Sequence, residues 1–217
     1  VLALPVQSQA QKTPDPLLAS ELVNRYADNI FYNTKASGMA IVAIDANQRI
    51  FASRGVVRPG SKQPPAKDSL VRIASLSKLM SSELMVKLAE EGRLKLDDPL
   101  SKYAPAGARV PSWNGQPIRL INLATHTSGL PREQPGGKAM RPVFTWPTNS
   151  QRWAWLRTAQ LKSAPGQVAS YSNLAFDLLG DALAKAGGKP YPTQIGRHTS
   201  ALQSHHVLVC RLLPEKT

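Results

Sequence analysis

Ser75 and Lys78 have the residue types and the spacing of a nucleophile and its base. Residues i and i+3 of a helix lie one turn apart on the same face, so the hydroxyl and the amine can approach each other. A serine hydroxyl is a weak nucleophile until a base takes its proton, and a lysine is such a base only when neutral. With 19 serines and 13 lysines in the chain, about one Ser-x-x-Lys is expected by chance. The pattern alone therefore also fits a serine helix cap followed by a surface lysine.

A second candidate is the tripeptide Tyr171-Ser172-Asn173, which precedes an apolar helical segment. A tyrosine hydroxyl can relay a proton between a nucleophile and a leaving amine. An asparagine side chain can hydrogen-bond a lysine and a substrate amide at the same time. Taken alone, however, the tripeptide is better explained by a buried tyrosine followed by Asn173 as a helix cap.

A third stretch, Leu123 to Gly137, holds His126 just before the turn-forming pairs Ser128-Gly129 and Leu130-Pro131. A histidine without a placed partner is weak evidence for base catalysis. We therefore expect His126 to be a structural residue that bonds a nearby loop.

Apolar periodicity predicts the elements that position these residues. Asp15-Pro16 begins a helix that ends near Asn33. Two strands follow as a hairpin, over 39–45 and 49–57, joined by a turn at Ala46-Asn47-Gln48. A strong helix is expected over 75–91, with Gly92 in the left-handed conformation after it. Shorter helices are expected over 118–125, 150–161 and 174–186.

The chain carries a formal net charge of +13. Such a charge favours anionic surroundings, namely nucleic acid, the face of an anionic membrane or a cell-wall polymer. The densest basic cluster (Arg49, Arg54, Arg58, Lys62, Lys67) lies in a loop-rich region without interleaved aromatic residues. We therefore expect a solvated basic surface and no nucleic-acid partner. No apolar run approaches the length of a membrane span, so any membrane contact is expected to be peripheral.

The two ends of the chain differ from the rest. Residues 1–10 contain Ser8-Gln9-Ala10, the small-x-small form of a signal-peptidase site, and we expect them to be the remnant of a secretory signal. Residues 11–190 are expected to form the domain. Residues 191–217 hold the single cysteine, Cys210, which allows no disulfide within the chain. This segment shows no sustained period, and we expect an aberrant, frameshifted tail, which reading the gene in the other frames would test.

Several segments, in their order and spacing, resemble the serine penicillin-binding proteins and class C β-lactamases. These segments are IASLSKLM, EEGRLKLDDPLSKYAP, LATHTSGLP and APGQVASYSNLAFDLLGDAL. Within that family, NLATHTSGLPREQPGG and RPVFTWPTNSQRW look most like AmpH-type D-alanyl-D-alanine carboxypeptidases and endopeptidases. The resemblance implies an α+β fold of the β-lactamase/transpeptidase type. In that fold the N-terminal hairpin would be present, and the C-terminal strands of the antiparallel sheet would be missing.

The resemblance also implies a role for each candidate residue. Ser75 is the acylated nucleophile, with its backbone N–H as half of the oxyanion hole, and Lys78 takes its proton. Tyr171 assists proton transfer, and Asn173 orients the substrate amide. The implied partners are peptidoglycan peptides ending in D-Ala-D-Ala, and β-lactams that acylate the same serine. No metal or organic cofactor is implied.

The family's third motif is Lys or His, then Ser or Thr, then Gly, and this tripeptide does not occur in the chain. By the resemblance, its strand supplies the second oxyanion donor, and losing such a donor costs roughly 10²–10³ in rate. Three interpretations stay open. The chain is a serine DD-peptidase, a β-lactamase or esterase on the same scaffold, or a non-catalytic muropeptide-binding protein.

Overall fold

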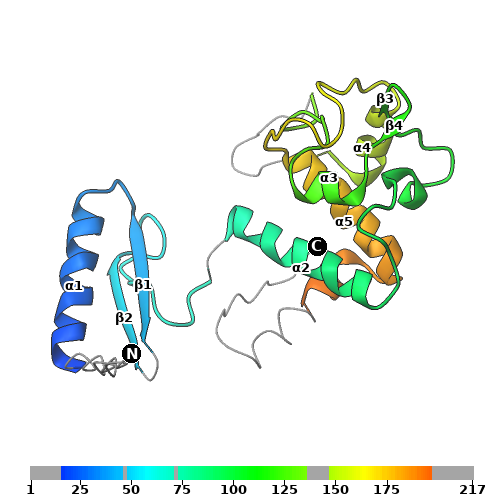
Figure 1. Cartoon of the computed structure of the whole chain (residues 1–217). Coiled ribbons are helices and arrows are strands. Elements are labelled where there is room, and N and C mark those ends of the chain that lie inside the picture. The colour runs from blue at the N-terminus through cyan, green and yellow to red at the C-terminus, as the bar shows by residue number, and fades with distance from the viewer. Residues whose placement is uncertain (1–15, 46–47, 71–72, 136–146, 197–217) are drawn as a thin grey trace, which may run out of the picture. The chain divides into compact units, whose positions relative to one another are not determined.

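A computed structural model describes residues 16–45, 48–70, 73–135 and 147–196 of the 217-residue chain (Figure 1). The chain divides into two compact units, Val1–Val71 and Arg72–Thr217. The expected signal remnant, the turn residues Ala46 and Asn47, and Cys210 lie outside the described residues. In the described part of the chain, no helix is both long and apolar enough to cross a membrane.

The first unit is a helix packed on a hairpin. The helix α1 (Pro16–Tyr32) begins with proline, whose fixed φ suits the first helical position. The strands β1 (Gly38–Asp45) and β2 (Gln48–Gly55) pair antiparallel, with Gly38 opposite Gly55 and Asp45 opposite Gln48. The predicted helix and hairpin are therefore confirmed, with small shifts at their ends.

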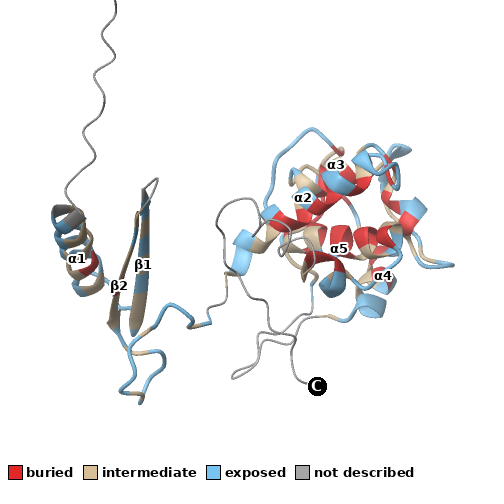
Figure 2. Ribbon diagram, turned by 90° about the horizontal axis from the view of Figure 1, so that it is seen from below, coloured by how far each residue is buried: buried red, intermediate tan, exposed pale blue. Residues whose placement is uncertain are grey.

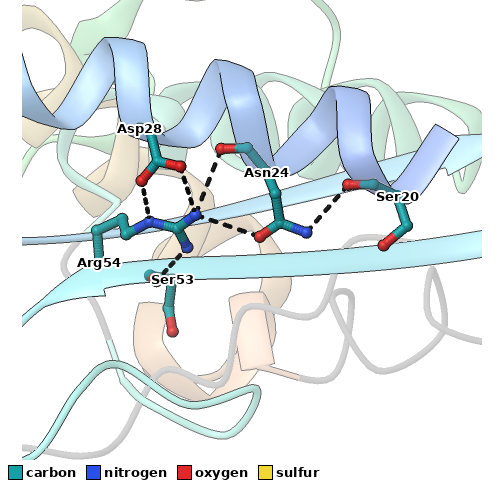
Figure 3. A network of polar contacts seen from close by, with 5 residues as sticks. All are labelled: Ser20, Asn24, Asp28, Ser53 and Arg54. Atoms are coloured by element: carbon teal, nitrogen blue, oxygen red, sulfur yellow. Dashed lines mark hydrogen bonds and ion pairs between the residues drawn. The ribbon is translucent and has the colours of Figure 1, made fainter. Parts of the chain in front are cut away.

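A polar network ties α1 to β2 (Figure 3). Arg54 on β2 donates from Nε and Nη2 to the two carboxylate oxygens of Asp28, at 2.6 and 3.1 Å. Its Nη2 also lies 3.3 Å from both the side-chain and backbone oxygens of Asn24. The hydrogen bond from Arg54 lowers the pKa of Asp28. Arg54 was expected on a solvated basic surface, but the structure makes it a link between helix and strand.

The second unit is built around two helices, α2 (Ser77–Glu90) and α5 (Asn173–Gly187). A 3-10 turn, η1 (Ala74–Leu76), leads into α2, and α3 (Leu120–Ala124) and α4 (Asn149–Leu156) contribute to the same core. Figure 2 shows buried residues gathered on α2, α3 and α5. The largest fully buried apolar side chains are Leu100, Ile118, Leu120, Leu123, Leu130, Leu156, Leu174, Leu178, Leu179 and Leu183. This core is rich in leucine and packs the two principal helices against each other.

Three short elements of this unit were not predicted. They are η2 (Leu100–Tyr103) and the paired strands β3 (Ser112–Trp113) and β4 (Gln116–Pro117). Asn114 and Gly115 join the two strands with φ of 47° and 82°. Positive φ at both central residues is the signature of a type I′ hairpin turn, which Asn-Gly favours.

The ends of the helices of the second unit follow from local chemistry. Gly92 has φ of +69° and takes the left-handed position predicted for it after α2. Gly188 caps α5 in the same way, with φ of 64°. The predicted helix over 150–161 is too long, because α4 ends at Leu156. The predicted helix over 118–125 is likewise shortened to α3.

The packed part of this unit continues past the boundary expected at residue 190. Residues 191–196 are helical, and Gln194 and Ile195 are buried. The Tyr191 hydroxyl lies 2.5 Å from the Ser81 hydroxyl on α2. The first turns of the expected tail therefore complete the core, and residues 197–217 lie outside the described residues.

Candidate active site

The junction of η1 and α2 places Ser75 and Lys78 on one face. The amine of Lys78 donates to Ser75 Oγ at 3.2 Å. Ser75 is exposed, and Lys78 is partly buried beside it. The preceding residue, Ala74, has φ of 47°. A left-handed backbone costs a residue other than glycine about 1–2 kcal/mol, and such strain clusters at functional sites.

The conformation of Ser172 explains why the side chains of its two neighbours, Tyr171 and Asn173, point in the same direction. Its backbone is extended, with φ of −138° and ψ of 115°, and its side chain caps α5 by accepting from Ala175 N at 3.0 Å. Side chains on either side of an extended residue point in the same direction. With Ser172 buried as the cap, Tyr171 and Asn173 are both free to face the nucleophile. The helix cap is therefore Ser172 and not Asn173.

The structure brings the four predicted site residues together. The hydroxyl oxygens of Ser75 and Tyr171 lie 2.6 Å apart. The amine of Lys78 donates to Asn173 Oδ1 at 2.8 Å as well as to Ser75. The Ser75 hydroxyl thus contacts two groups that are able to accept a proton, which is the contact that activation of a serine nucleophile requires.

The electrostatic environment of Tyr171 favours proton transfer. Hydrogen bonding with Lys78 and then with Ser75 lowers the pKa of the Tyr171 hydroxyl below its usual value of 10.0. Two cations contribute further, because Lys78 Nζ and Arg132 Cζ each lie 4.9 Å from the centre of the tyrosine ring. A phenol with a lowered pKa loses its proton more readily, so a larger fraction is present at neutral pH as the phenolate that can accept a proton.

Sequence reasoning missed Glu133 and Arg132. The side-chain amide of Asn173 donates to Glu133 Oε1, and the Asn173 backbone N–H donates to the carbonyl of Arg132 at 2.9 Å. Because Glu133 accepts from Nδ2, the Oδ1 of Asn173 must face Lys78. Both residues belong to the quoted stretch LATHTSGLPREQPGG, but that stretch contained no signal for a contact about 40 residues further along the chain.

His126 bonds a nearby loop, as predicted. Its Nδ1 accepts a hydrogen bond from the Ser172 backbone N–H at 3.1 Å, so it bonds the loop that carries Tyr171. Its ring centre lies 4.5 Å from that of Tyr171 and 5.1 Å from that of Phe176. No hydrogen bond between described residues joins His126 to Ser75. The predicted bond from His126 to a nearby loop is confirmed, and its structural role stays a prediction.

A pocket of about 540 Å³ opens beside Ser75 and Lys78 between α2 and α5. This volume falls in the range of small-molecule sites. Three carboxylates line it, Glu133, Asp177 and Asp181, and Asp181 accepts from Arg152 at 3.3 Å and from Trp153 Nε1 at 3.1 Å. Burial raises the pKa of Asp177. Within the described ranges, no three His, Cys, Asp or Glu side chains are grouped so as to hold a metal ion.

An α+β fold in which Ser-x-x-Lys faces Tyr-x-Asn beside a pocket defines a protein of the β-lactamase/transpeptidase type. The chain belongs to the beta-lactamase family, whose sequence model matches residues 20–206. The predicted fold class is thereby confirmed, with the helical region and the N-terminal hairpin both in place.

Comparison with individual proteins shows which members of the family the chain resembles. The chain is 66% identical over 182 residues to the D-alanyl-D-alanine-carboxypeptidase/endopeptidase AmpH of Escherichia coli K12, a match that covers 84% of the chain and 47% of AmpH. It is 29% identical over 188 residues to a beta-lactamase of the same organism, covering 86% of the chain and 47% of that protein. The chain thus spans about half the length of the curated relatives it matches.

A solved structure has a similar fold. The β-lactamase/D-alanine carboxypeptidase of Yersinia pestis superposes with a TM-score of 0.81 at 56% identity, covering 88% of this chain and 55% of that one. The resemblance to AmpH-type proteins that the motifs indicated is therefore confirmed by both comparisons.

Proposed function

We propose that the chain is a serine hydrolase that cleaves peptidoglycan peptides ending in D-Ala-D-Ala, as a DD-carboxypeptidase or endopeptidase. The observation that most directly supports this proposal is that Ser75 Oγ lies 2.6 Å from Tyr171 OH and 3.2 Å from Lys78 Nζ. Support comes from the relative of 66% identity, whose name states this activity.

The first half of the reaction transfers the acyl group to the serine. Ser75 Oγ attacks the carbonyl carbon of the terminal peptide bond while its proton passes to Lys78 or Tyr171. The resulting tetrahedral oxyanion collapses, and the C–N bond breaks. Tyr171 returns the proton to the departing amine, so that D-alanine, or a cross-linked amine in the endopeptidase reaction, leaves neutral. The product on the enzyme is an ester of Ser75.

The second half hydrolyses that ester. A water molecule takes the place of the departed amine and gives a proton to Tyr171 or Lys78 as it attacks the ester carbonyl. The Ser75 oxygen then leaves and regains its proton from the same groups. Asn173, fixed between Lys78 and Glu133, is placed to hydrogen-bond the substrate amide during both halves. The peptide is released one D-alanine shorter.

Penicillins provide the direct test, because their strained amide is attacked by the same serine and the leaving nitrogen stays tethered to the adduct. Purified chain incubated with benzylpenicillin should gain the mass of one intact penicillin molecule. The matched pair is Ser75→Ala and Ser77→Ala, since Ser77 lines the same pocket but its hydroxyl donates to the Ala74 carbonyl, at 2.8 Å. We expect the adduct in the parent chain and in Ser77→Ala, and none in Ser75→Ala.

Two results would contradict this proposal. An adduct that persists in Ser75→Ala would place the nucleophile elsewhere. Absence of any adduct on a chain that unfolds cooperatively would show that the assembled geometry does not acylate. D-alanine release from a D-Ala-D-Ala peptide, measured in the same samples, then tests turnover of the natural substrate class.

A β-lactamase or esterase on this scaffold is the second candidate, favoured by the family match and by the beta-lactamase of 29% identity. The two activities differ in how fast the acyl ester is hydrolysed. An adduct that persists for hours favours a DD-peptidase, whereas rapid loss of the adduct with consumption of penicillin favours a β-lactamase.

A non-catalytic muropeptide-binding protein is the alternative of another class. Muropeptide binding without D-alanine release, unchanged by Ser75→Ala, would favour it. In either case we propose action in the periplasm, on the basis of the candidate processing site Ser8-Gln9-Ala10, with peripheral attraction to anionic membrane or cell wall from the net charge of +13. Cell fractionation tests the location.

A further inference from the structure

His126 holds the backbone on both sides of Tyr171. Its carbonyl oxygen accepts from the Ser170 N–H at 2.8 Å, and its Nδ1 accepts from the Ser172 N–H at 3.1 Å. Tyr171 is the residue between these two anchors, and its ring lies against the ring of His126. His126 thereby anchors the backbone on both sides of the residue whose hydroxyl meets Ser75.

The backbone of His126 is left-handed in this arrangement. Its φ is 59°, in the left-handed region that residues other than glycine rarely adopt. The chain has just left α3, which ends at Ala124, and the left-handed residue turns the carbonyl and the ring toward the loop of Tyr171. Strain of this kind persists only where surrounding contacts hold it. Here those contacts are with the loop that carries Tyr171, whose hydroxyl meets Ser75.

The bond to Ser172 requires a ring that is unprotonated at Nδ1. A neutral imidazole accepts at one nitrogen, whereas a protonated ring has two donors and no acceptor. The charged and titratable groups around the ring are Lys78 on α2, Tyr171 in the loop, and Arg132 over the tyrosine ring, while α5 presents the uncharged Phe176. Burial and then the charge of Lys78 lower the pKa of His126, which keeps the acceptor available.

We propose that His126 is a positioning residue that holds Tyr171 against Ser75 through its unprotonated Nδ1, and that protonation of the ring releases the loop and suppresses acylation of Ser75. The suppression of acylation rests on the proposed function, whereas the positioning of the loop does not. Protonation would turn the acceptor into a donor facing the Ser172 N–H. It would also add a cation beside Lys78, and both changes push the loop away from its present position.

The matched variants are His126→Asn and His126→Gly. Asparagine and glycine both tolerate the left-handed backbone. Asparagine can present an oxygen in place of Nδ1 but does not titrate, and glycine offers no acceptor. Both lose the ring, so their difference isolates the hydrogen bond to Ser172. Thermal unfolding of each variant shows that the comparison is made between folded proteins.

The rate of penicillin acylation is measured from about pH 5 to pH 8, the range over which histidine changes charge. We expect the parent chain to lose acylation more steeply on the acid side than the Asn variant, which keeps only the pH dependence that Lys78 and Tyr171 contribute. At neutral pH the Asn variant should acylate about 2–10-fold faster than the Gly variant, the usual effect of one hydrogen bond. Equal acid limbs in the parent and in the Asn variant, or equal rates in the two variants, would overturn the proposal.

A second measurement separates this inference from the proposed function. In the parent chain, the Ser172 amide proton resonance should shift with the titration of His126, and in the Asn variant it should stay constant. If penicillin never acylates the chain but the resonance titrates, the proposed function fails and the positioning role stands. A Ser172 resonance that is insensitive to pH in the parent chain would overturn the positioning role itself.

Discussion

The hydroxyl oxygens of Ser75 and Tyr171 lie 2.6 Å apart although 96 positions separate the two residues in the sequence. Ser75 comes from the turn before α2, and Tyr171 from the residue before the cap of α5. The contact therefore exists because the leucine-rich core fixes the beginnings of these two helices next to each other. A change that moves the start of one helix relative to the other should therefore slow acylation of Ser75 even where the protein stays folded.

Tyr171→Phe tests the proton-transfer role of the tyrosine. Phenylalanine keeps the ring that stacks on His126 but removes the hydroxyl that contacts Ser75. Because a positioned acid or base contributes about 10²–10⁴ in rate, we expect penicillin acylation to slow by about a hundredfold or more. The acylation rate is measured by quenching at timed intervals and recording intact mass.

Tyr103→Phe is the matched control. The Tyr103 hydroxyl also takes part in a short hydrogen bond, to Asp98 at 2.6 Å, but this side chain is buried away from Ser75. This variant should lower the unfolding temperature and leave the acylation rate close to that of the parent chain. Equal acylation in Tyr171→Phe and Tyr103→Phe would show that Tyr171 has no part in proton transfer.

The long elements and the Ser75–Lys78 pair could be predicted for physical reasons, whereas the meeting of this pair with Tyr171 and Asn173 was predicted from the family resemblance. α1, α2 and α5 carry sustained apolar periodicity, and Ser75 and Lys78 share a face because of helix geometry alone. The β3–β4 turn carried the Asn114-Gly115 signal that predicts such turns, but its strands are too short to show alternation. Glu133 was beyond prediction, since its position beside Asn173 depends on how the loop after α3 packs on α5.

Glu133→Ala tests whether this carboxylate fixes the side chain of Asn173. Without an acceptor for Nδ2, the amide of Asn173 is free to rotate away from Lys78 and from the substrate. Hydrogen bonds to charged groups are worth about 1.5–3 kcal/mol, so we expect acylation to slow by about tenfold or more. Glu133→Gln keeps an acceptor oxygen and should lose less. If both variants acylate like the parent chain, Glu133 does not position Asn173.

Asp98 should make the stability of the second unit sensitive to acid. Burial raises the pKa of this carboxyl, but hydrogen bonds from Lys102, Tyr103 and the Lys95 N–H outweigh burial and lower it to about 2. The stabilisation is complete above the unfolded value of 3.8 and is lost as the pH falls through about 2. A shift of this size corresponds to about 2 kcal/mol of unfolding free energy at neutral pH.

Denaturant unfolding at several acidic pH values measures this effect in the parent chain and in Asp98→Asn. The variant should be less stable at neutral pH, and its stability should depend less on pH below 3.8. Asp97→Asn is the control, because Asp97 is the exposed neighbour in the same turn. The assignment fails if Asp97→Asn and Asp98→Asn have the same acid profile.

Substitution by alanine should destabilise the protein more at Gly129 than at Gly92. Both glycines have a left-handed backbone, with φ of +76° and +69°. A Cβ at position 129 would lie 2.4 Å from the backbone oxygen of Ser163, whereas a Cβ at position 92 would meet nothing within 4 Å. The left-handed conformation alone costs alanine about 1–2 kcal/mol. Gly129→Ala adds a clash with backbone, for which a further 1–3 kcal/mol is typical. Chemical denaturation should therefore rank Gly129→Ala well below Gly92→Ala in stability, and equal losses would mean that the loop from Ser128 to Pro131 can move away from Ser163 without cost.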